Sequence, residues 1–544
     1  MSTQKTVAKA AGLMMAAILL SRVLGLVREM VISHKFGQGA LVDAYGAAFN
    51  LPDLLYFFLS SGALSSAFIP VFVEYLHTNR ERDAWRIFSA VGCLMAIGLV
   101  GAVVLTEIFA HPLVALVAPG FRHDPEMLQR TVFLTRIVLP AQLFFFLGGL
   151  MMATLEARQR FTARALGPVI YNVGIIFGAV VLSRYIRTDQ GISALCWGAV
   201  GGAFAGNVLL SYFSLRRAGY QFIPNLNLRH PGVVQVGKLA LPVMLGLSLP
   251  QIDVIINRSF ASLLQDGSIA ALNYGNRLMQ VPLGVFAQAA AVAFFPTLAA
   301  HAAARRMTDL RSSLNLAIRG IFFLTIPASV FMMVLATPII RAVYQSGEYK
   351  AADALVASPA LLFYCAGIFA WGGQAIISRG FYALQDTLTV IIVGSIMTAI
   401  FIPLNYVLKD AMGVGGLALA TSIAATLHMF ALMFLLRKRI GGLGSKRLAV
   451  STGKILLSSA ALAAVCWAAK SAIAQTTDIT TRSGAAKVVF ASMPAGLVVY
   501  LIMMWLLRSE EMSFFGSMLK AQLGKRTVGE AEIAEEAEAG AMLE

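Results

Sequence analysis

The stretch LLSRVLGLVREM, from Leu19 to Met30, places two arginines and a glutamate inside an apolar segment near the N-terminus. Apolar segments of this kind recur along all 544 residues, of which 58% are hydrophobic and only 13% are charged. The mean hydropathy is +0.75. A segment that crosses the bilayer needs about 20 apolar residues, and its backbone groups must bond internally, as they do in a helix. The sequence therefore predicts an all-α polytopic membrane protein.

The apolar runs predict fourteen transmembrane helices. Short segments of alternating hydrophobicity, which would indicate a membrane β-barrel, are not visible. The expected helices are residues 9–34, 41–76, 84–110, 127–156, 163–185, 191–215, 237–264, 269–302, 312–345, 353–379, 387–408, 414–436, 447–470 and 485–507. Since proline removes one hydrogen bond of a helix, Pro52, Pro250 and Pro282 are candidate kink sites.

The loops between these helices differ in charge. One set, which includes HTNRERDAWR (77–86) and RKRIGGLGSKR (437–447), is much richer in lysine and arginine than the set that includes SHKFGQGAL (33–41). By the positive-inside rule the first set faces the cytoplasm, which places both termini there. The net charge of +16 then belongs to membrane topology, and no nucleic-acid partner is expected. No cleavable signal peptide is expected either.

The two halves of the chain repeat each other. The segments EARQRFTAR and YALQDTLTV match at Gln159 and Gln385, and SSAFIPVFVEY and AVAFFPTLAAH match at Pro70 and Pro296 with the same separation. An even number of helices in each repeat returns the chain to the same side of the membrane. The sequence thus predicts two six-helix lobes in a pseudo-twofold arrangement, a plan common among transporters.

The repeat also sets the predicted domain boundaries. The last two helices lie outside the duplication, and the end of the chain, EAEIAEEAEAGAMLE, is acidic and weakly apolar. The expected divisions are an N-terminal six-helix lobe (1–217), a cytoplasmic linker (218–236), a C-terminal six-helix lobe (237–440), helices 13 and 14 (441–510) and a partly disordered cytoplasmic tail (511–544).

Charged side chains inside the apolar segments are the candidate functional residues, because a charge at the bilayer centre costs about 2.5 kcal/mol or more. The candidates are Arg22, Arg28, Glu29, Asp43, Asp53, Arg136, Asp253, Arg258, Arg277 and Arg319. Most lie on equivalent helices of the two lobes and would face one another. Purely structural roles remain as alternatives. The arginines, above all Arg136 and Arg319, can extend to the membrane interface, or they can pair with carboxylates, and Asp43 can cap its own helix.

The candidate cavity is net cationic, and arginine is suited to bidentate recognition of phosphate. An anionic substrate, a phosphate or pyrophosphate, is therefore expected. No catalytic constellation, nucleotide motif or metal-ligand spacing is visible, so we expect a transporter that is not an enzyme and has no cofactor and no metal site. The four cysteines are far apart and read as small buried residues.

Extended to SRVLGLVREMVISHKFGQGALVDAYGAAFNLPDLL, the opening stretch resembles the N-terminal signature of the MurJ (MviN) family, the lipid II flippases of the MOP exporter superfamily. The resemblance continues at GALSSAFIPVF, NYGNRLMQVPLGVF and RGFYALQDT and covers essentially the whole chain. It implies two lobes around a cationic cavity and a lipid-tail groove built by residues 441–510. The substrate-binding residues that it suggests are Arg22, Arg28, Glu29, Asp43 and Arg277, with Asp253 and Arg258 as additions from the same cavity.

This chain departs from some relatives at several positions. Tyr56 and Ser61 stand where relatives carry an arginine and a glutamate, and Asn276 stands where an acid is often found. Asp253 and Arg258 are candidates for compensating charges. Helix 11 offers Asn405 and no acid, which argues against sodium coupling.

The resemblance implies a flippase that moves lipid II from the cytoplasmic to the outer leaflet of the bacterial inner membrane by alternating access, in peptidoglycan synthesis. Membrane lipids and cell-wall synthesis proteins are further candidate partners. Three alternatives stay open: a flippase for another polyprenyl-pyrophosphate-linked glycan, a multidrug or cation antiporter of the same superfamily, and a scaffold that transports nothing. Neutral replacement of the intramembrane charges would be harmless only in the last case.

Overall fold

The computed structural model describes residues 2–59, 63–186, 188–221, 223, 227 and 229–513. The first part of the chain, which we call the first half, contains α1 (Ser2–Phe36), α2 (Ala40–Ala48), α3 (Asn50–Leu59), α4 (Ala63–His77), α5 (Glu81–Ile108), α6 (Ala110–Val117), η1 (Pro119–His123), α7 (Pro125–Val138), α8 (Ala141–Ala157), α9 (Thr162–Val180), η2 (Leu182–Arg184), η3 (Thr188–Gly191), α10 (Ser193–Ala203), η4 (Phe204–Leu209) and α11 (Leu210–Arg216).

A long helix, α12 (Pro231–Ala261), follows the first half. The remainder, which we call the second half, contains α13 (Ser268–Pro282), η5 (Leu283–Ala287), α14 (Gln288–Ala303), α15 (Met307–Val334), α16 (Ala336–Tyr344), α17 (Ala351–Cys365), α18 (Ile368–Ala383), α19 (Thr387–Ile440), α20 (Ser445–Thr476) and α21 (Arg482–Leu506). The all-α fold class is confirmed, because the described residues form helices and turns and contain no strand.

In the described part of the chain, nine helices are long and apolar enough to cross a membrane. Some expected spans are divided: residues 41–76 correspond to α2, α3 and α4, and residues 127–156 to α7 and α8. The short helix α6 begins at the end of the expected span 84–110, in a region predicted as a loop. Its eight residues are too few to cross a membrane. The total of fourteen spans stays a prediction.

The element α19 covers two expected helices, 387–408 and 414–436, and reverses direction between them. Gly413 has φ 55° and ψ −130°, a conformation that glycine adopts without a steric penalty. A Cβ atom on Gly416 would lie only 1.9 Å from the carbonyl oxygen of Leu408, a residue that would be far away in a continuous helix. The two arms of α19 therefore fold back on each other at this turn.

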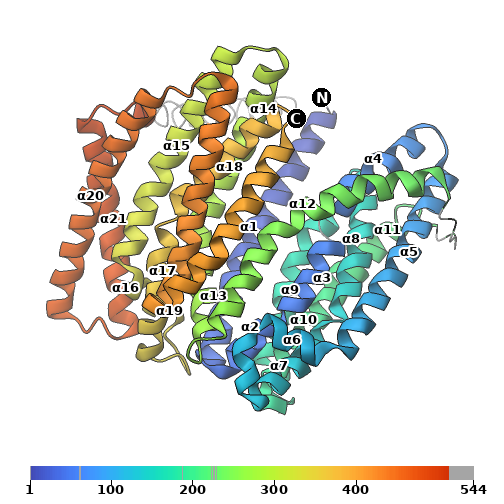
Figure 1. The fold of residues 1–544 in the computed structure, drawn as a ribbon, viewed down its shortest axis with the longest axis horizontal. Coiled ribbons are helices and arrows are strands. Elements are labelled where there is room, and N and C mark those ends of the chain that lie inside the picture. Colours follow the sequence, from blue (N-terminus) through green and yellow to red (C-terminus); the bar gives the residue numbers. More distant parts are fainter. Residues whose placement is uncertain are drawn as a thin grey trace, which may run out of the picture.

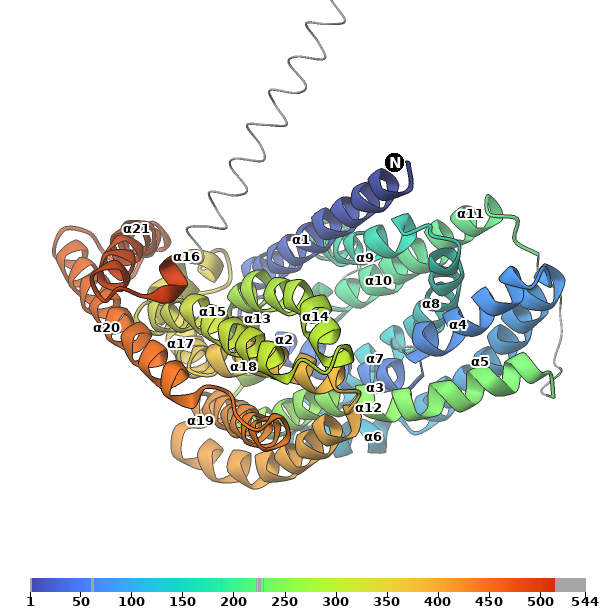
Figure 2. The ribbon, with the colours of Figure 1, turned by 90° about the horizontal axis from the view of Figure 1, so that it is seen from above.

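The first and second halves lie side by side (Figure 1), with the blue-to-cyan helices on one side and the yellow-to-red helices on the other. α20 and α21 form the outer edge of the second half, which Figure 2 shows from above. α12 connects the halves, since it packs against α3 and α4 of the first half and against α19 of the second. It begins at Pro231, six residues before the expected span and inside the expected linker 218–236.

Glycines bring α9 and α10 into close contact. A Cβ atom on Gly178 would lie 2.4 Å from the carbonyl oxygen of Ala194, and one on Gly198 would lie 2.4 Å from that of Gly174. Small residues at such spacing let two membrane helices approach until their backbones touch. This contact holds α9, which carries residues of the candidate site, against the rest of the first half.

Replacing Gly178 with alanine is expected to lower the free energy of unfolding by about 1–3 kcal/mol, because the new methyl group would collide with backbone that cannot move alone. Thermal unfolding of the purified protein measures the effect. Gly98→Ala in α5 is the matched control, since a Cβ atom there would have no neighbour within 4 Å. Equal melting temperatures for the two variants would contradict the close-packing argument.

The two halves are tied together at one end, the lower end in Figure 1 where α2 and α13 lie. Both carboxylate oxygens of Asp43 in α2 accept hydrogen bonds, from the backbone N–H groups of Gly267 and Ala270, at 2.8 Å each. The Tyr274 hydroxyl donates to the carbonyl oxygen of Gly37 at 2.9 Å. We call this end, with its hydrogen bonds between the halves, the closed end.

Candidate functional site

A cavity of 360 Å³ lies between the two halves and is lined by residues of both. Its wall contains three arginines, Arg28 from α1, Arg258 from α12 and Arg277 from α13. It also contains two carboxylates, Glu29 from α1 and Asp53 from α3. The structure thus brings four of the seven predicted binding residues together with Asp53, and the cavity has one positive charge more than it has negative charges.

Glu29 is the point at which the charges of the two halves meet. Arg28 Nη2 donates a hydrogen bond to Glu29 Oε1 at 2.6 Å, and Arg277 Nη2 lies 3.6 Å from the same oxygen. Arg28 Nη1 also donates to Asn172 Oδ1 in α9 at 3.2 Å. Two guanidinium groups therefore share one carboxylate, which leaves hydrogen-bonding capacity on both cations for an anionic ligand.

Arg258 of α12 makes the other contact across this cavity, to α3 of the first half. Its Nη1 atom donates to Asn50 Oδ1 at 3.1 Å and lies 3.5 Å from Asp53 Oδ2. The Nε atoms of Arg28 and Arg258 are buried and have no hydrogen-bond partner among the described residues. A buried donor without a partner costs free energy, so these two N–H groups favour a ligand that carries acceptor oxygens.

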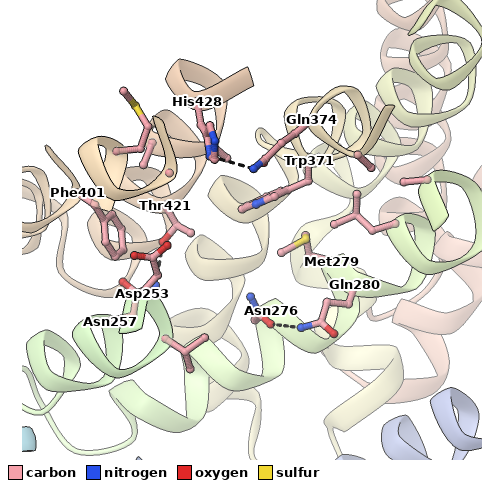
Figure 3. Close-up of a pocket in the computed structure, with 18 of the residues that line it drawn as sticks. Asp253, Asn257, Asn276, Met279, Gln280, Trp371, Gln374, Phe401, Thr421 and His428 are labelled. Carbon is pink, nitrogen blue, oxygen red and sulfur yellow. Dashed lines mark hydrogen bonds between the residues drawn. The ribbon is translucent and has the colours of Figure 1, made fainter. Parts of the chain in front are cut away.

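A second cavity, of 580 Å³, adjoins the first. Figure 3 shows residues that line this second cavity. We call the two the smaller and the larger cavity. Polar side chains of the second half point into the larger cavity, and the Thr398 hydroxyl donates to Asp253 Oδ1 at 2.8 Å. His428 and Gln374 are joined by a hydrogen bond of 2.9 Å. The cavities adjoin because four residues line both of them, namely Val254, Asn257, Asn276 and Gln280.

Arg22 lines the larger cavity and not the smaller one. The sequence predicts one cationic cavity, and the structure places Arg22 and Arg28 in two adjoining cavities. The reason is the helical rise of about 1.5 Å per residue, which separates positions six residues apart by about 9 Å along α1. Arg22 forms no ion pair or hydrogen bond with the described residues.

Asp43 lines neither cavity. It is buried, with 3% of its surface exposed, and it caps the N-terminus of α13 in the other half. A cap on its own helix, the alternative that the sequence left open, is not what the structure contains. Its position suits an anion, because the N-terminus of a helix carries partial positive charge.

Arg136 and Arg319 also lie outside both cavities. Arg136 is half exposed and its Nε atom lies 3.6 Å from Glu107 Oε2. Arg319 is buried, with 3% of its surface exposed, and pairs with Glu510 and Glu511, which follow α21. This pairing compensates the charge of Arg319.

The ion pairs of Arg319 anchor the end of the described chain. Burial alone would raise the pKa of the Glu511 carboxyl, but hydrogen bonds from Ser509, Ser451 and Arg319 outweigh it and hold that pKa below its ordinary value of 4.5. The pKa of Glu510 is also lowered, first by its hydrogen bond from Arg319. Both carboxylates thus remain ionised at neutral pH and fix α21 to α15 and α20.

The positions that depart from relatives fall in different places. Asn276 lines both cavities and accepts a hydrogen bond from Gln280 at 2.6 Å. Asn405 is buried and donates to the carbonyl oxygen of Phe401, in its own helix, at 3.0 Å. Tyr56 packs edge-on against Phe145. Ser61 lies outside the described residues.

Several polar residues that line the two cavities, and one that contacts Arg28 from outside them, Asn172, were not singled out from the sequence. They are Tyr45, Asn172, Asn257, Tyr364, Gln374 and His428. Asn172 lies in the apolar run VIYNVGIIF, and a lone amide in such a run is a signal that could have been used. The tyrosines gave no such signal, because aromatic residues are equally common in packed cores.

Comparison with known proteins agrees with this architecture. The family model described as "Lipid II flippase MurJ" matches residues 32–483. A relative from Haemophilus influenzae, named "Probable lipid II flippase MurJ", is 31% identical over 82% of this chain and 90% of its own length.

Solved structures extend the comparison to the fold. A structure titled "Lipid II flippase MurJ, inward closed conformation" has a TM-score of 0.76 at 27% identity, over 91% of this chain and 99% of that one. An inward-facing multidrug transporter of the MATE family has a TM-score of 0.64 at 15% identity, over 78% of this chain and 96% of its own, and shows the MOP-superfamily fold alone. By family model, relative and fold together, this chain belongs to the MurJ family of lipid II flippases.

Proposed function

We propose that this protein moves lipid II from the cytoplasmic to the outer leaflet of the bacterial inner membrane by alternating access. The observation that carries the proposal is the meeting of Arg28 and Arg277, from different halves, at the single carboxylate of Glu29. A pyrophosphate offers oxygens to both guanidinium groups, and each charge-assisted hydrogen bond is worth about 1.5–3 kcal/mol. Flipping needs no bond to be made or broken, which agrees with a family of transporters rather than enzymes.

The smaller cavity is the proposed pyrophosphate site. Its residues in the proposal are Arg28, Glu29, Arg258 and Arg277. The larger cavity, with Arg22 and Asp253, has the volume and the polar lining to receive sugar and peptide groups of the same substrate. Because the two cavities adjoin, one headgroup can occupy both. Asp43 acts in this proposal on the closed end and not on the substrate.

Orientation follows from the loop charges, which favour cytoplasmic positions for both termini. In that orientation the closed end faces the outside, and the structure corresponds to the state that receives substrate from the cytoplasm. Rocking of the halves would open the closed end and expose the headgroup to the outer leaflet. The membrane potential can help to reset the empty cationic cavity, since one charge that crosses 100 mV gains about 2.3 kcal/mol.

The remaining parts of the chain have proposed roles in the same cycle. The two lobes, residues 1–217 and 237–440, move against each other, and residues 218–236 link them. Helices 13 and 14, residues 441–510, hold the undecaprenyl tail in contact with lipid, while the tail segment 511–544 stays in the cytoplasm. Membrane lipids surround the helices, and cell-wall synthesis proteins are proposed partners that supply or take up the substrate.

Complementation tests the proposal. The full chain is expressed in a bacterium depleted of its own lipid II flippase, and lipid II exposed on the outer leaflet is measured with an impermeant probe. We expect growth and outer-leaflet lipid II to recover together. Recovery of another polyprenyl-linked glycan without lipid II would instead favour the first alternative, and export of organic cations without either lipid would favour the antiporter.

A further inference from the structure

Gly284 lies in the π-helical turn η5, directly after Pro282, on the wall of the larger cavity. Its backbone does not require glycine, because its φ is not among the positive values of the chain. Glycine inside a helix costs about 1 kcal/mol relative to alanine. The reason for a glycine at this position must therefore be sought in the space that a side chain would fill.

The guanidinium group of Arg22 occupies that space. A Cβ atom on Gly284 would lie 1.5 Å from Arg22 Nη1, 2.5 Å from Cζ and 3.2 Å from Nε. At Gly178 and Gly198, by contrast, the nearest atoms are backbone atoms of a packed helix. The missing side chain of Gly284 thus serves a guanidinium group from the opposite half and not the contact between two helices.

Among the described residues, Arg22 has no other fixed partner. It is exposed to the cavity and forms no ion pair or hydrogen bond with the described residues, whereas Arg28, Arg258 and Arg277 each lie beside a carboxylate. An arginine side chain without partners loses up to about 2 kcal/mol of rotamer freedom when a ligand fixes it. The space left by the missing side chain of Gly284 already confines the guanidinium group of Arg22. This confinement reduces the loss of rotamer freedom on binding and leaves the N–H groups of Arg22 available to an anion.

We propose that Gly284 is a positioning residue for substrate binding: the notch that it leaves in η5 holds the Arg22 guanidinium across the larger cavity, preorganised for an oxygen-rich anionic group of the headgroup. This inference rests on the proposed function, because it assigns a role in binding lipid II. π-Helical turns frequently occur at functional sites in membrane and soluble proteins, and this one follows a proline that releases a backbone hydrogen bond.

A double-mutant cycle separates positioning from a structural role. Affinity for lipid II is measured with the purified full chain in lipid nanodiscs for wild type, Gly284→Ala, Arg22→Ala and the double variant. We expect Arg22→Ala to weaken binding about 100-fold and Gly284→Ala about tenfold, as for charge-assisted hydrogen bonds lost or misplaced. In the Arg22→Ala background, Gly284→Ala should change affinity by less than about twofold, because its effect runs through the missing guanidinium.

Two further variants make the result specific. Arg22→Leu ends at the Cδ position and lacks Nη1, Cζ and Nε, the three atoms that the new methyl group would meet, so Arg22→Leu/Gly284→Ala should bind as Arg22→Leu alone does. Gly237→Ala in α12, where a Cβ atom would have no neighbour within 4 Å, controls for the substitution itself. The melting temperature of Gly284→Ala should match that of wild type, since the flexible end of Arg22 can move aside.

The outcomes are distinguishable. If Arg22→Ala weakens binding but Gly284→Ala has no effect, or weakens binding equally in both backgrounds, the positioning role is wrong and the proposed function stands. If Arg22→Ala binds lipid II as tightly as wild type, the assignment of the larger cavity to the substrate is wrong, and the role of Gly284 fails with it.

Discussion

Arg277→Ala is expected to abolish lipid II transport. The substitution removes the guanidinium group with which, among the described residues, the second half reaches Glu29, and each charge-assisted hydrogen bond that this group can donate to a phosphate oxygen is worth about 1.5–3 kcal/mol. Affinity for lipid II should fall by at least about 30-fold, and the variant should not restore growth of a flippase-depleted strain. Arg277→Lys should recover only part of the affinity, because an ammonium group cannot offer the bidentate fork.

Arg136→Ala is the matched control for this prediction. Arg136 is also an arginine of an apolar segment with a carboxylate nearby, but it is half exposed and lines neither cavity. It should bind lipid II and support growth as wild type does. If Arg277→Ala also did so, the convergence of charges at Glu29 would be a structural ion pair and not the substrate site.

Asp43→Ala is expected to open the closed end rather than to weaken substrate binding directly. The variant leaves the backbone N–H groups of Gly267 and Ala270 buried without acceptors, at about 1–3 kcal/mol each. Because the lost hydrogen bonds join the two halves, the melting temperature should fall and the closed end should separate. A cysteine introduced at the buried position Ser268 should then react faster with an impermeant thiol reagent applied from outside.

Asp124→Ala provides the comparison, since Asp124 caps α7 with the same chemistry. It accepts hydrogen bonds from the backbone N–H groups of Glu126 and Met127 at 3.0 Å each, entirely within the first half. Its loss should lower the melting temperature without exposing the cysteine at position 268. Equal labelling in the two backgrounds would show that Asp43 does not hold the halves together, and would return it to the list of candidate ligands of the headgroup.

The fold class and the cationic cavity could be predicted from the sequence because the argument depends only on the residues within each apolar segment. Charges in a bilayer are so unfavourable that Arg28, Glu29 and Arg277 had to face each other or water, and seven-residue spacing already places Arg22 and Glu29 on one face of α1. The cost of a charge in the bilayer does not indicate which residues pair with Asp43 or Arg319. Those partners come from distant segments, and their positions depend on how helices shift along one another.

Helix boundaries show the same division. Hydropathy located residues 387–408 and 414–436 correctly as helical, but the reversal at Gly413 with no separating loop depends on a single backbone conformation. The division of residues 41–76 among α2, α3 and α4 is likewise not visible in the average hydropathy. Average apolar content identifies a span but not the point at which the chain turns within it.

The helix α12 belongs to both halves, since it packs on α3 and α4 at one side and on α19 at the other. A helix packed against both halves must bend or tilt when the halves move apart. Proline carries no backbone N–H, so Pro242 and Pro250 in the sequence of α12 give this helix two points at which it can bend. Elastic deformation of one helix would then contribute to the barrier between the two conformations and set how quickly the transporter cycles.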